Sequence, residues 1–495
     1  MLAVLVVPTI LAFLLIVATN LRLGIVGEWV WNRAPSPPWN PLNWLLPLAA
    51  LAIYLVVAVI GAKLLSNRHE AWIIFLAPLA IFFAALWQWA LVDFANPGGG
   101  PERWIPSQYF KATSGYFTVA QSIDDVGSFI EKYQSWTKDA DNFHLGTHPP
   151  GLILLNWFAI DTFEKYPELG RQIEQWTPAR IRDGFEIVGT PLPQAERAAL
   201  ITLSVGTWLI SLLTMIPIYG LVRLGGTKAQ AWWGALFWPV IPASTLFIPV
   251  GDALYPFLAA SILWLTIASF RTRIGILALF AGGILWIGMM LSLAFVVVAA
   301  IGGLTVVWLS LSEGKWGRGI VTVLALLAGL LLPVELLYDS LGLNLIEVWR
   351  INLTKHAGFY DAMPRSYVPW IIVDLVEFAV VSGPGLFLAA TIYIVTHAWR
   401  RNAGAVDQLL VVWLILLIFL DLSGRNRSEV ARLWLFLAPL VVVGAARGLD
   451  RFQDTRFPWL LPASGLAISA VLSLALLGWT EPLLPIVATP GPIGG

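Results

Sequence analysis

Hydrophobic and polar positions follow one another along this chain in long blocks. About thirteen apolar runs are long enough to cross roughly 30 Å of hydrocarbon as helices, at ~1.5 Å per residue. This pattern predicts an all-α polytopic membrane protein. The expected spans lie near residues 2–19, 44–64, 71–92, 198–222, 230–250, 253–270, 274–290, 292–311, 319–336, 369–395, 407–422, 431–447 and 458–478.

The longest polar block covers residues 93–197, after the third expected span. Irregular backbone cannot face lipid, because hydrocarbon offers it no hydrogen-bond partner. We therefore expect a large loop outside the bilayer, carrying interfacial helices and inserted between the third and fourth spans. The run from Pro149 to Ile160 is too short to span and is expected to form a re-entrant or interfacial helix. No internal repeat is visible, so residues 1–495 are expected to form a single transmembrane domain.

Basic residues in short connections predict the orientation by the positive-inside rule. They fall in every second connection, which places these connections and the N-terminus in the cytoplasm of an inner (plasma) membrane protein. The 93–197 block, the 337–368 loop, the 423–430 loop and the tail after Thr480 are then extracytoplasmic. The basic connections contain Lys63 and Arg68, Arg223 and Lys228, Arg271 and Arg273, Lys315 and Arg318, Arg400 and Arg401, and Arg447, Arg451 and Arg456.

The amino-acid composition supports a membrane protein and argues against nucleic-acid binding and cysteine-based sites. Hydrophobic residues make up 58% of the chain, charged residues 12%, and the mean hydropathy is +0.77. Soluble domains carry about 25% charged residues. The 30 basic and 30 acidic residues balance, so no nucleic-acid partner is indicated. The chain has no cysteine, which excludes disulfides, zinc–thiolate sites and thiol nucleophiles.

Two of the five histidines lie in Asn-Phe-His-Leu-Gly-Thr-His-Pro-Pro-Gly at residues 142–151. His144 and His148 have a spacing that suits a metal ion on a helix, but Gly146 and the two prolines disfavour a helix there. We interpret His148 as a hydrogen-bond donor or charge partner to an anionic group, beside the N-terminus of the next short helix. A structural role for either histidine, and a divalent cation as cofactor, stay open.

Four aspartates expected on the extracytoplasmic side are candidate site residues. Asp93 sits where the third span ends, and a partly desolvated carboxylate there suits a catalytic base for a hydroxyl. The alternative is a helix-end carboxylate facing water. Asp124 and Asp125 follow Ser122, and Ser122-x-x-Asp125 favours a capping box that opens a helix at 123–136 over a catalytic role. Asp252 is either the N-cap of the following helix or a carboxylate aimed into an outer cavity.

Cationic side chains gather in the later outer loops. His356 and Arg365 lie in the 337–368 loop, and Arg427 and Arg432 lie in Ser-Gly-Arg-Asn-Arg-Ser-Glu-Val-Ala-Arg-Leu-Trp at 423–434. Arg432 is one turn inside a span, where a charge requires a partner. Guanidinium groups match phosphate oxygens, so these residues could hold a phosphate or pyrophosphate at the bilayer surface. Alternatively, Arg432 pairs with Asp421 or Glu429 and only locks two helices together.

This pattern resembles the GT-C superfamily of membrane glycosyltransferases, in particular bacterial relatives of the protein mannosyltransferase and aminoarabinose transferase group. The resemblance rests on Thr147-His148-Pro149-Pro150-Gly151, on Phe247-x-Pro249-x-x-Asp252-x-x-Tyr255 and, less specifically, on residues 426–434. It implies a GT-C-like bundle and inverting transfer of a sugar from a polyprenyl-phosphate donor to a glycan, lipid or protein acceptor. The base implied by the family maps onto Asp93. Two extra spans precede the loop and Phe94 follows Asp93 directly, which leaves Asp124 and Asp125 open as the base.

In this interpretation Asp93, Asp252 and His148 are the catalytic residues. The substrate is bound by Asp124, Asp125, His144, His356, Arg365, Arg427 and Arg432. Two other classes remain as alternatives: a non-catalytic GT-C-like subunit of a larger membrane complex, and a transporter of lipid or small solute. A transporter requires ionisable residues near the bilayer midplane. Here the ionisable residues within spans, Asp374, Glu377 and Asp421, lie toward outer ends.

Overall fold

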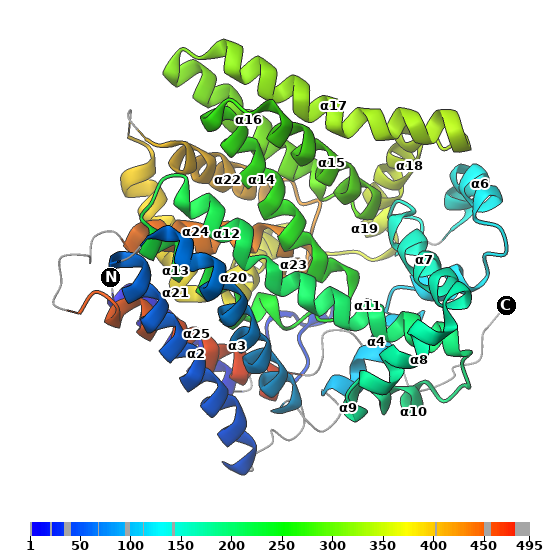
Figure 1. The fold of residues 1–495 in the computed structure, drawn as a ribbon, viewed down its shortest axis with the longest axis horizontal. Helices are drawn as coiled ribbons and strands as arrows, with labels where there is room; N and C mark the ends of the chain where they lie inside the picture. Colours follow the sequence, from blue (N-terminus) through cyan, green and yellow to red (C-terminus); the bar gives the residue numbers. More distant parts are fainter. Residues whose placement is uncertain are drawn as a thin grey trace.

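The computed structural model describes residues 2–19, 22–33, 41–67, 69–94, 100–111, 113–140, 144–400, 403–449 and 457–480. Within these ranges the fold is an α-helical bundle with one two-stranded antiparallel sheet (Figure 1). Several residues used above lie outside the described residues: Arg68, Asn142, Phe143, Arg401, Arg451, Arg456 and the tail beyond Thr480.

The N-terminal region precedes the first long polar block. It forms α1 (Leu2–Ala18), β1 (Gly24–Ile25), β2 (Trp29–Val30), α2 (Pro41–Asn67), η1 (Glu70–Trp72) and α3 (Ile73–Phe94). The polar block then folds into short helices, namely η2 (Pro101–Arg103), α4 (Trp104–Tyr109), α5 (Tyr116–Gln121), α6 (Val126–Asp139), α7 (Gly151–Lys165), α8 (Pro167–Trp176), α9 (Ala179–Arg182) and α10 (Gly184–Val188).

The rest of the chain is mostly apolar helix. Its first half contains α11 (Gln194–Leu213), α12 (Met215–Arg223), α13 (Lys228–Phe237), η3 (Trp238–Val240), η4 (Pro242–Ser244), η5 (Gly251–Leu254), α14 (Tyr255–Thr272), α15 (Gly275–Leu291), α16 (Phe295–Glu313) and α17 (Trp316–Leu341). Its second half contains α18 (Leu345–Ala357), α19 (Phe359–Ala362), α20 (Tyr367–Ser382), α21 (Pro384–Tyr393), η6 (Ile394–Ala398), α22 (Ala405–Leu422), α23 (Val430–Leu433), η7 (Leu435–Leu437), α24 (Ala438–Gly448) and α25 (Leu460–Trp479).

The prediction of an all-α polytopic membrane protein is confirmed. Eight helices among the described residues are long and apolar enough to cross a membrane, and nine if the bent pair α20 and α21–η6 counts as one span. Three shorter apolar helices cover Leu2–Ala18, Gly275–Leu291 and Leu435–Gly448. The count of thirteen from the hydropathy pattern is not confirmed.

Two of the expected spans differ from the structure in an informative way. The run at 230–250 is not one helix, because α13 stops at Phe237 and η3 and η4 follow. Prolines in this run lack the backbone N–H that a continuing helix needs. The run at 369–395 bends by 105° between α20 and α21, at Gly383, whose φ of +85° few other residues adopt. Hydropathy alone detects neither break.

The broken backbone after α13 needs hydrogen-bond partners, and Gln88 of α3 supplies one. The Gln88 amide donates to the carbonyl of Pro239 at 3.2 Å and to the Ser244 hydroxyl at 3.1 Å. It also accepts the indole N–H of Trp208 at 2.9 Å. A buried amide with its groups paired is stable away from water. Gln88 therefore holds the break at η3 against α3.

Contacts link all six expected basic connections on one face of the molecule. This agrees with the alternation that the positive-inside rule used, since every second connection must lie on the same side. The linking contacts are Glu70 with Arg223, Arg447 with the carbonyl of Gly225, Arg447 with Asp407, Gln408 with Ser312, and Glu313 with Arg271.

We expect Arg447→Met to destabilise the fold strongly, because it leaves the Asp407 carboxylate buried without its guanidinium. Their atoms lie 3.2 Å apart. Breaking such a buried pair from one side typically removes about 3–5 kcal/mol. Thermal unfolding in detergent measures the effect. As a control, Arg350→Met breaks a pair in which the arginine side chain is 70% exposed, where we expect less than about 1 kcal/mol. Equal losses in the two variants would contradict this assignment.

The helices of the first polar block gather at one end of the bundle, at the right of Figure 1. There α18, from the 337–368 loop, packs against α6 (Figure 1). The side-chain amide of Asn352 in α18 donates to the carbonyl of Gly146 at 2.8 Å. Two regions that the sequence assigned to the same side of the membrane are therefore in direct contact.

Candidate functional site

A turn at residues 144–150 presents His148 at the start of α7. Its Nδ1 lies 2.9 Å from the carbonyl oxygen of His144 and 3.1 Å from the Thr147 hydroxyl. A carbonyl oxygen only accepts, so Nδ1 carries the proton and Nε2 has the lone pair. The helix then begins at Gly151, where an added Cβ would lie 2.4 Å from the carbonyl oxygen of Met290. Glycine thus allows the turn to approach the end of α15 closely.

Burial lowers the pKa of His148 below its ordinary value of 6.5, the Asp252 carboxylate opposes this shift, and the charges of Arg432 and His356 add to it. Packing brings the four separate segments together: Gly251 lies against Leu152 of α7, η5 packs against η7, and Asn352 of α18 donates to the carbonyl of Gly146. The structure thus brings together four of the residues that the sequence analysis selected. We call His148, Asp252, His356 and Arg432 the His148 cluster.

The protonation of His148 changes the role expected for it. An imidazole with a lowered pKa is neutral near pH 7. Its only N–H is at Nδ1, which already faces the His144 carbonyl. Nε2 can therefore accept a hydrogen bond from a hydroxyl, whereas the donor role toward an anion is not favoured.

Asp252 lies inside the first turn after the break that follows α13. The N-cap of η5 is Val250, so the interpretation of Asp252 as a helix cap is wrong. An added Cβ on Gly251 would lie 2.8 Å from Leu152, which shows how closely η5 packs on α7. One turn later, the ring of Tyr255 packs edge-on against Phe295, with centroids 5.5 Å apart. Asp252 is thereby held beside the His148 turn.

Arg432 is the cation of the cluster. Its guanidinium contacts the Glu429 carboxylate at 3.0 Å and its side chain is 17% exposed. The expected pairing with Glu429 is confirmed, but it is not the whole role of Arg432, since Asp252, Tyr116 and Tyr255 also face its charge. η7, which follows α23, packs against η5 and α14. Arg432 therefore lies between its own loop and the Asp252 turn.

His356 approaches the cluster from the end of α18. Burial lowers its pKa, and the charge of Arg425 contributes to this shift. The same loop is held near this end of the chain by the Tyr360 hydroxyl of α19, which donates to the carbonyl of Arg425 at 3.3 Å.

Two supporting side chains were missed by the sequence analysis. The Tyr133 hydroxyl of α6 donates to the carbonyl of His148 at 3.0 Å. The ring of Tyr116 in α5 packs edge-on against the His148 imidazole, with centroids 5.9 Å apart. Each is a single aromatic residue in a polar block, and no local pattern identifies its partner.

Asp93 belongs to a different set of contacts. Its carboxylate lies 3.2 Å from the guanidinium of Arg180, which also binds Glu102 at 2.9 Å. These groups join the end of α3 to η2 and α9 near Gly100, where an added Cβ would lie 2.6 Å from Arg180. Asp93 already has a cationic partner there.

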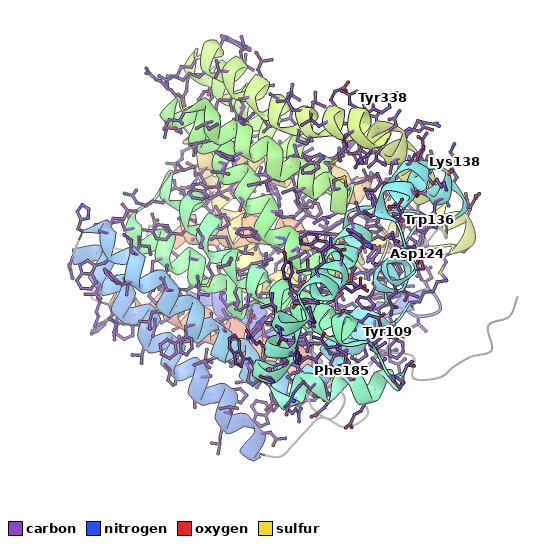
Figure 2. The ribbon with its side chains drawn as sticks, turned by 45° about the vertical axis from the view of Figure 1, so that its right-hand side comes forward. Tyr109, Asp124, Trp136, Lys138, Phe185 and Tyr338 are labelled. Atoms are coloured by element: carbon purple, nitrogen blue, oxygen red, sulfur yellow. The ribbon has the colours of Figure 1, made fainter. Side chains whose placement is uncertain are left out.

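Asp124 and Asp125 are exposed in the connection between α5 and α6. Figure 2 shows Asp124 in the same outer group of helices as Trp136 and Lys138. Asp125 is the N-cap of α6 and accepts the backbone N–H of Ser128 at 2.8 Å. Hydrogen bonds from the side chain and then the backbone of Ser128 hold the pKa of Asp125 below its usual range. The structure therefore gives Asp125 a capping role.

The expected capping box at Ser122 is wrong in detail. Ser122 closes α5, and its hydroxyl donates to the carbonyl of Val119 at 2.7 Å. The following helix consequently starts at Val126 rather than at residue 123.

Arg365 and Arg427 stabilise loops around the N-terminal hairpin. Arg365 donates to the carbonyl of Glu28, between β1 and β2. Arg427 donates to the carbonyl of Arg365 at 2.9 Å, and its guanidinium lies over the rings of Tyr360 and Tyr367 at 4.8 and 5.4 Å. Both guanidinium groups therefore hold together the loops around the N-terminal hairpin.

His144 contributes its backbone carbonyl to the His148 turn. Among the residues that the structure describes, no group of three or more histidine or acidic side chains could hold a metal ion. The spacing of four residues brings the His148 imidazole to the carbonyl of His144, at 2.9 Å, and so closes the turn.

We expect the stability of the protein to fall as the pH drops below about 6.5, the ordinary histidine value. The pKa values of His148 and His356 are lowered in the folded chain, so the unfolded chain binds protons more readily. This contribution is complete above the ordinary value and is lost as the pH falls through the lowered values. Melting temperatures in detergent at about pH 7.5 and 5.5 measure the loss.

The double variant His148→Asn/His356→Asn serves as the matched comparison. It should show a smaller difference between the two pH values than the unsubstituted protein, which retains both buried imidazoles. An equal difference would mean that these two histidines do not titrate on unfolding as described.

Comparison with known proteins gives no family. No family model matches this chain, and no curated protein shows a significant match to it.

Proposed function

We propose that the protein is a membrane glycosyltransferase that moves a sugar from a polyprenyl-phosphate donor to an acceptor. One observation carries this proposal: the segments of Asp252 and Arg432 pack beside the turn of His148, so that a carboxylate and a guanidinium both act on a neutral imidazole. A lipid phosphate needs a cation near the bilayer, and a sugar acceptor needs a proton acceptor beside it. The resemblance to the GT-C superfamily supports the same conclusion.

Arg432 is the group proposed to bind the lipid phosphate. A planar guanidinium matches phosphate oxygens and stabilises negative charge as the leaving group departs. Arg432 contacts Glu429 through one terminal nitrogen at 3.0 Å. Several N–H groups of a guanidinium can act at once, so a phosphate can join the pair without displacing Glu429.

Asp252 is the group proposed to accept the proton. In a single displacement, the acceptor hydroxyl oxygen attacks the anomeric carbon while the bond from that carbon to the phosphate oxygen breaks. The hydroxyl proton passes to the Asp252 carboxylate, and the electron pair leaves with the phosphate beside Arg432. The configuration at the sugar carbon inverts. Nε2 of His148 accepts a hydrogen bond from a substrate hydroxyl and orients it.

The structure leads us to prefer Asp252 to Asp93 as the base. Asp252 interacts with His148 and Arg432, whereas Asp93 is paired with Arg180. Asp252 thus lies beside both the imidazole proposed to orient the acceptor and the guanidinium proposed to hold the phosphate. Asp93 remains the residue implied by the family resemblance, and the two assignments are separated by the variants described below.

The proposed location is the extracytoplasmic face of the inner membrane. The basic connections share one face of the molecule. The residues of the His148 cluster belong to the other, alternate connections of the chain. By the positive-inside rule the basic face is cytoplasmic. The lipid-linked donor would then reach the outer end of the bundle by lateral diffusion among the membrane lipids.

Transfer by the purified protein tests this proposal. The protein is reconstituted with polyprenyl-phosphate sugars of several kinds and a panel of glycan, lipid and protein acceptors. We expect release of polyprenyl phosphate to depend on an acceptor. Equal release with and without protein across the panel would contradict the proposal. A flux assay in liposomes and a search for stoichiometric partners would then test the transporter and subunit alternatives.

A further inference from the structure

The turn that carries Arg432 into the His148 cluster has an unusual backbone. Ser428 and Glu429 have φ values of +78° and +56°, in the left-handed region that favours glycine. α23 starts directly after them, at Val430. Two successive residues of this kind persist only when surrounding contacts hold them, and such backbone tends to occur at functional sites.

Two buried carboxylates of α20 hold this turn. Asp374 accepts the backbone N–H of Ser428 at 3.0 Å, and Glu377 accepts the backbone N–H of Ala431 at 3.0 Å. Residues three apart lie on the same face of a helix, so one face of α20 contacts both ends of the turn. The two side chains are 1% and 0% exposed.

Glu377 acts as the cap of α23 from another helix. The N-cap position is Glu429, but its side chain makes no capping hydrogen bond and instead contacts Arg432 at 3.0 Å. The N–H groups of a first helical turn need an acceptor from elsewhere. Glu377 supplies one, and this leaves Glu429 available to orient the guanidinium.

We propose that Asp374 and Glu377 are positioning residues, which hold the left-handed turn at Ser428–Glu429 so that Arg432 points into the His148 cluster. This inference rests on the proposed function, since it gives Arg432 a phosphate to bind. Neither carboxylate touches the substrate. They act through the backbone of the turn, so their removal is expected to weaken phosphate binding through Arg432.

The test uses the full-length protein with Glu377→Leu and Glu377→Gln. Leucine removes the acceptor for the Ala431 N–H, whereas glutamine retains a carbonyl oxygen that can accept it. Hydrogen exchange of residues 428–434 reports the turn independently of any activity. We expect faster exchange in Glu377→Leu and near-normal exchange in Glu377→Gln. Unchanged exchange in Glu377→Leu would overturn the positioning role.

Binding of polyprenyl phosphate, without a sugar, reports the effect on Arg432. We expect affinity to fall about tenfold or more in Glu377→Leu and to be largely retained in Glu377→Gln. In the Arg432→Gln background, Glu377→Leu should add little, because it acts through the missing guanidinium. Additive losses would overturn the inference, as would normal binding by Glu377→Leu.

The two readouts separate this inference from the function it rests on. If the unsubstituted protein does not bind polyprenyl phosphate, the proposed function fails, and hydrogen exchange still decides whether Glu377 holds the turn. If the unsubstituted protein binds and Glu377→Leu binds equally well, only the positioning role fails.

Discussion

Arg432→Gln is expected to lower kcat for sugar transfer by about 10²–10³-fold, the effect of removing one well-placed group that stabilises developing charge. The departing phosphate gains negative charge as its bond to the sugar breaks, and Arg432 is the guanidinium that faces Asp252 and His148. The affinity for polyprenyl phosphate should fall as well. Steady-state transfer rates and lipid-phosphate binding on the purified variant measure both effects.

Arg350→Gln is the matched control for this variant. Arg350 is an exposed arginine of α18 that pairs with Glu347 at 2.6 Å on the same helix. Its loss removes the same charge from the same end of the molecule without touching the His148 cluster. Equal losses of activity in the two variants would show that general charge, rather than the position of Arg432, supports transfer.

Asp252→Asn is expected to lower kcat by about 10²–10⁴-fold, the usual contribution of a positioned base. Asparagine keeps the size of the side chain and removes its ability to take a proton. Asp93→Asn should retain much more activity, since Asp93 is held by Arg180 outside the cluster. Transfer rates for the two variants, with melting temperatures to verify folding, separate the two assignments. A larger loss in Asp93→Asn would return the base to Asp93.

The fold class could be predicted from the sequence because apolar runs of membrane length have few other uses. The positions of breaks could not. At 230–250 the run is mostly apolar. Its interruption depends on prolines and on Gln88 of α3, far away in sequence, which binds the Pro239 carbonyl and the Ser244 hydroxyl. At 369–395 the bend occurs at a single glycine, Gly383. A hydropathy average covers many residues, so it does not register one or two residues that break a helix.

The candidate site was predicted in part, through the sidedness of the connections. Placing polar loops on one face selected His148, Asp252, His356 and Arg432, and the charges of the other three act on the His148 imidazole in the structure. The same logic also selected Arg365 and Arg427, which the structure engages in loop contacts. The predicted topology tells on which side of the membrane a residue lies. Which residues on that side come together depends on tertiary packing.

The partners of the buried carboxylates could not be predicted. Asp374 and Glu377 are conspicuous as charges within a span, and a transporter would use such residues near the midplane. In the structure their carboxylates accept backbone N–H groups of Ser428 and Ala431. No sequence pattern couples a helix face to a backbone turn about fifty residues later. This contact is the reason why we assign them to positioning rather than to an ion path.

The central claim is that the His148 cluster binds the phosphate of a lipid-linked sugar. A structure of the reconstituted protein with a bound polyprenyl-phosphate analogue tests it most directly. We predict the phosphate within hydrogen-bond distance of Arg432, about 2.7–2.9 Å, with the lipid chain leaving along an apolar helix surface. A phosphate bound instead beside Arg180 and Asp93, or beside Arg365 and Arg427, would contradict it.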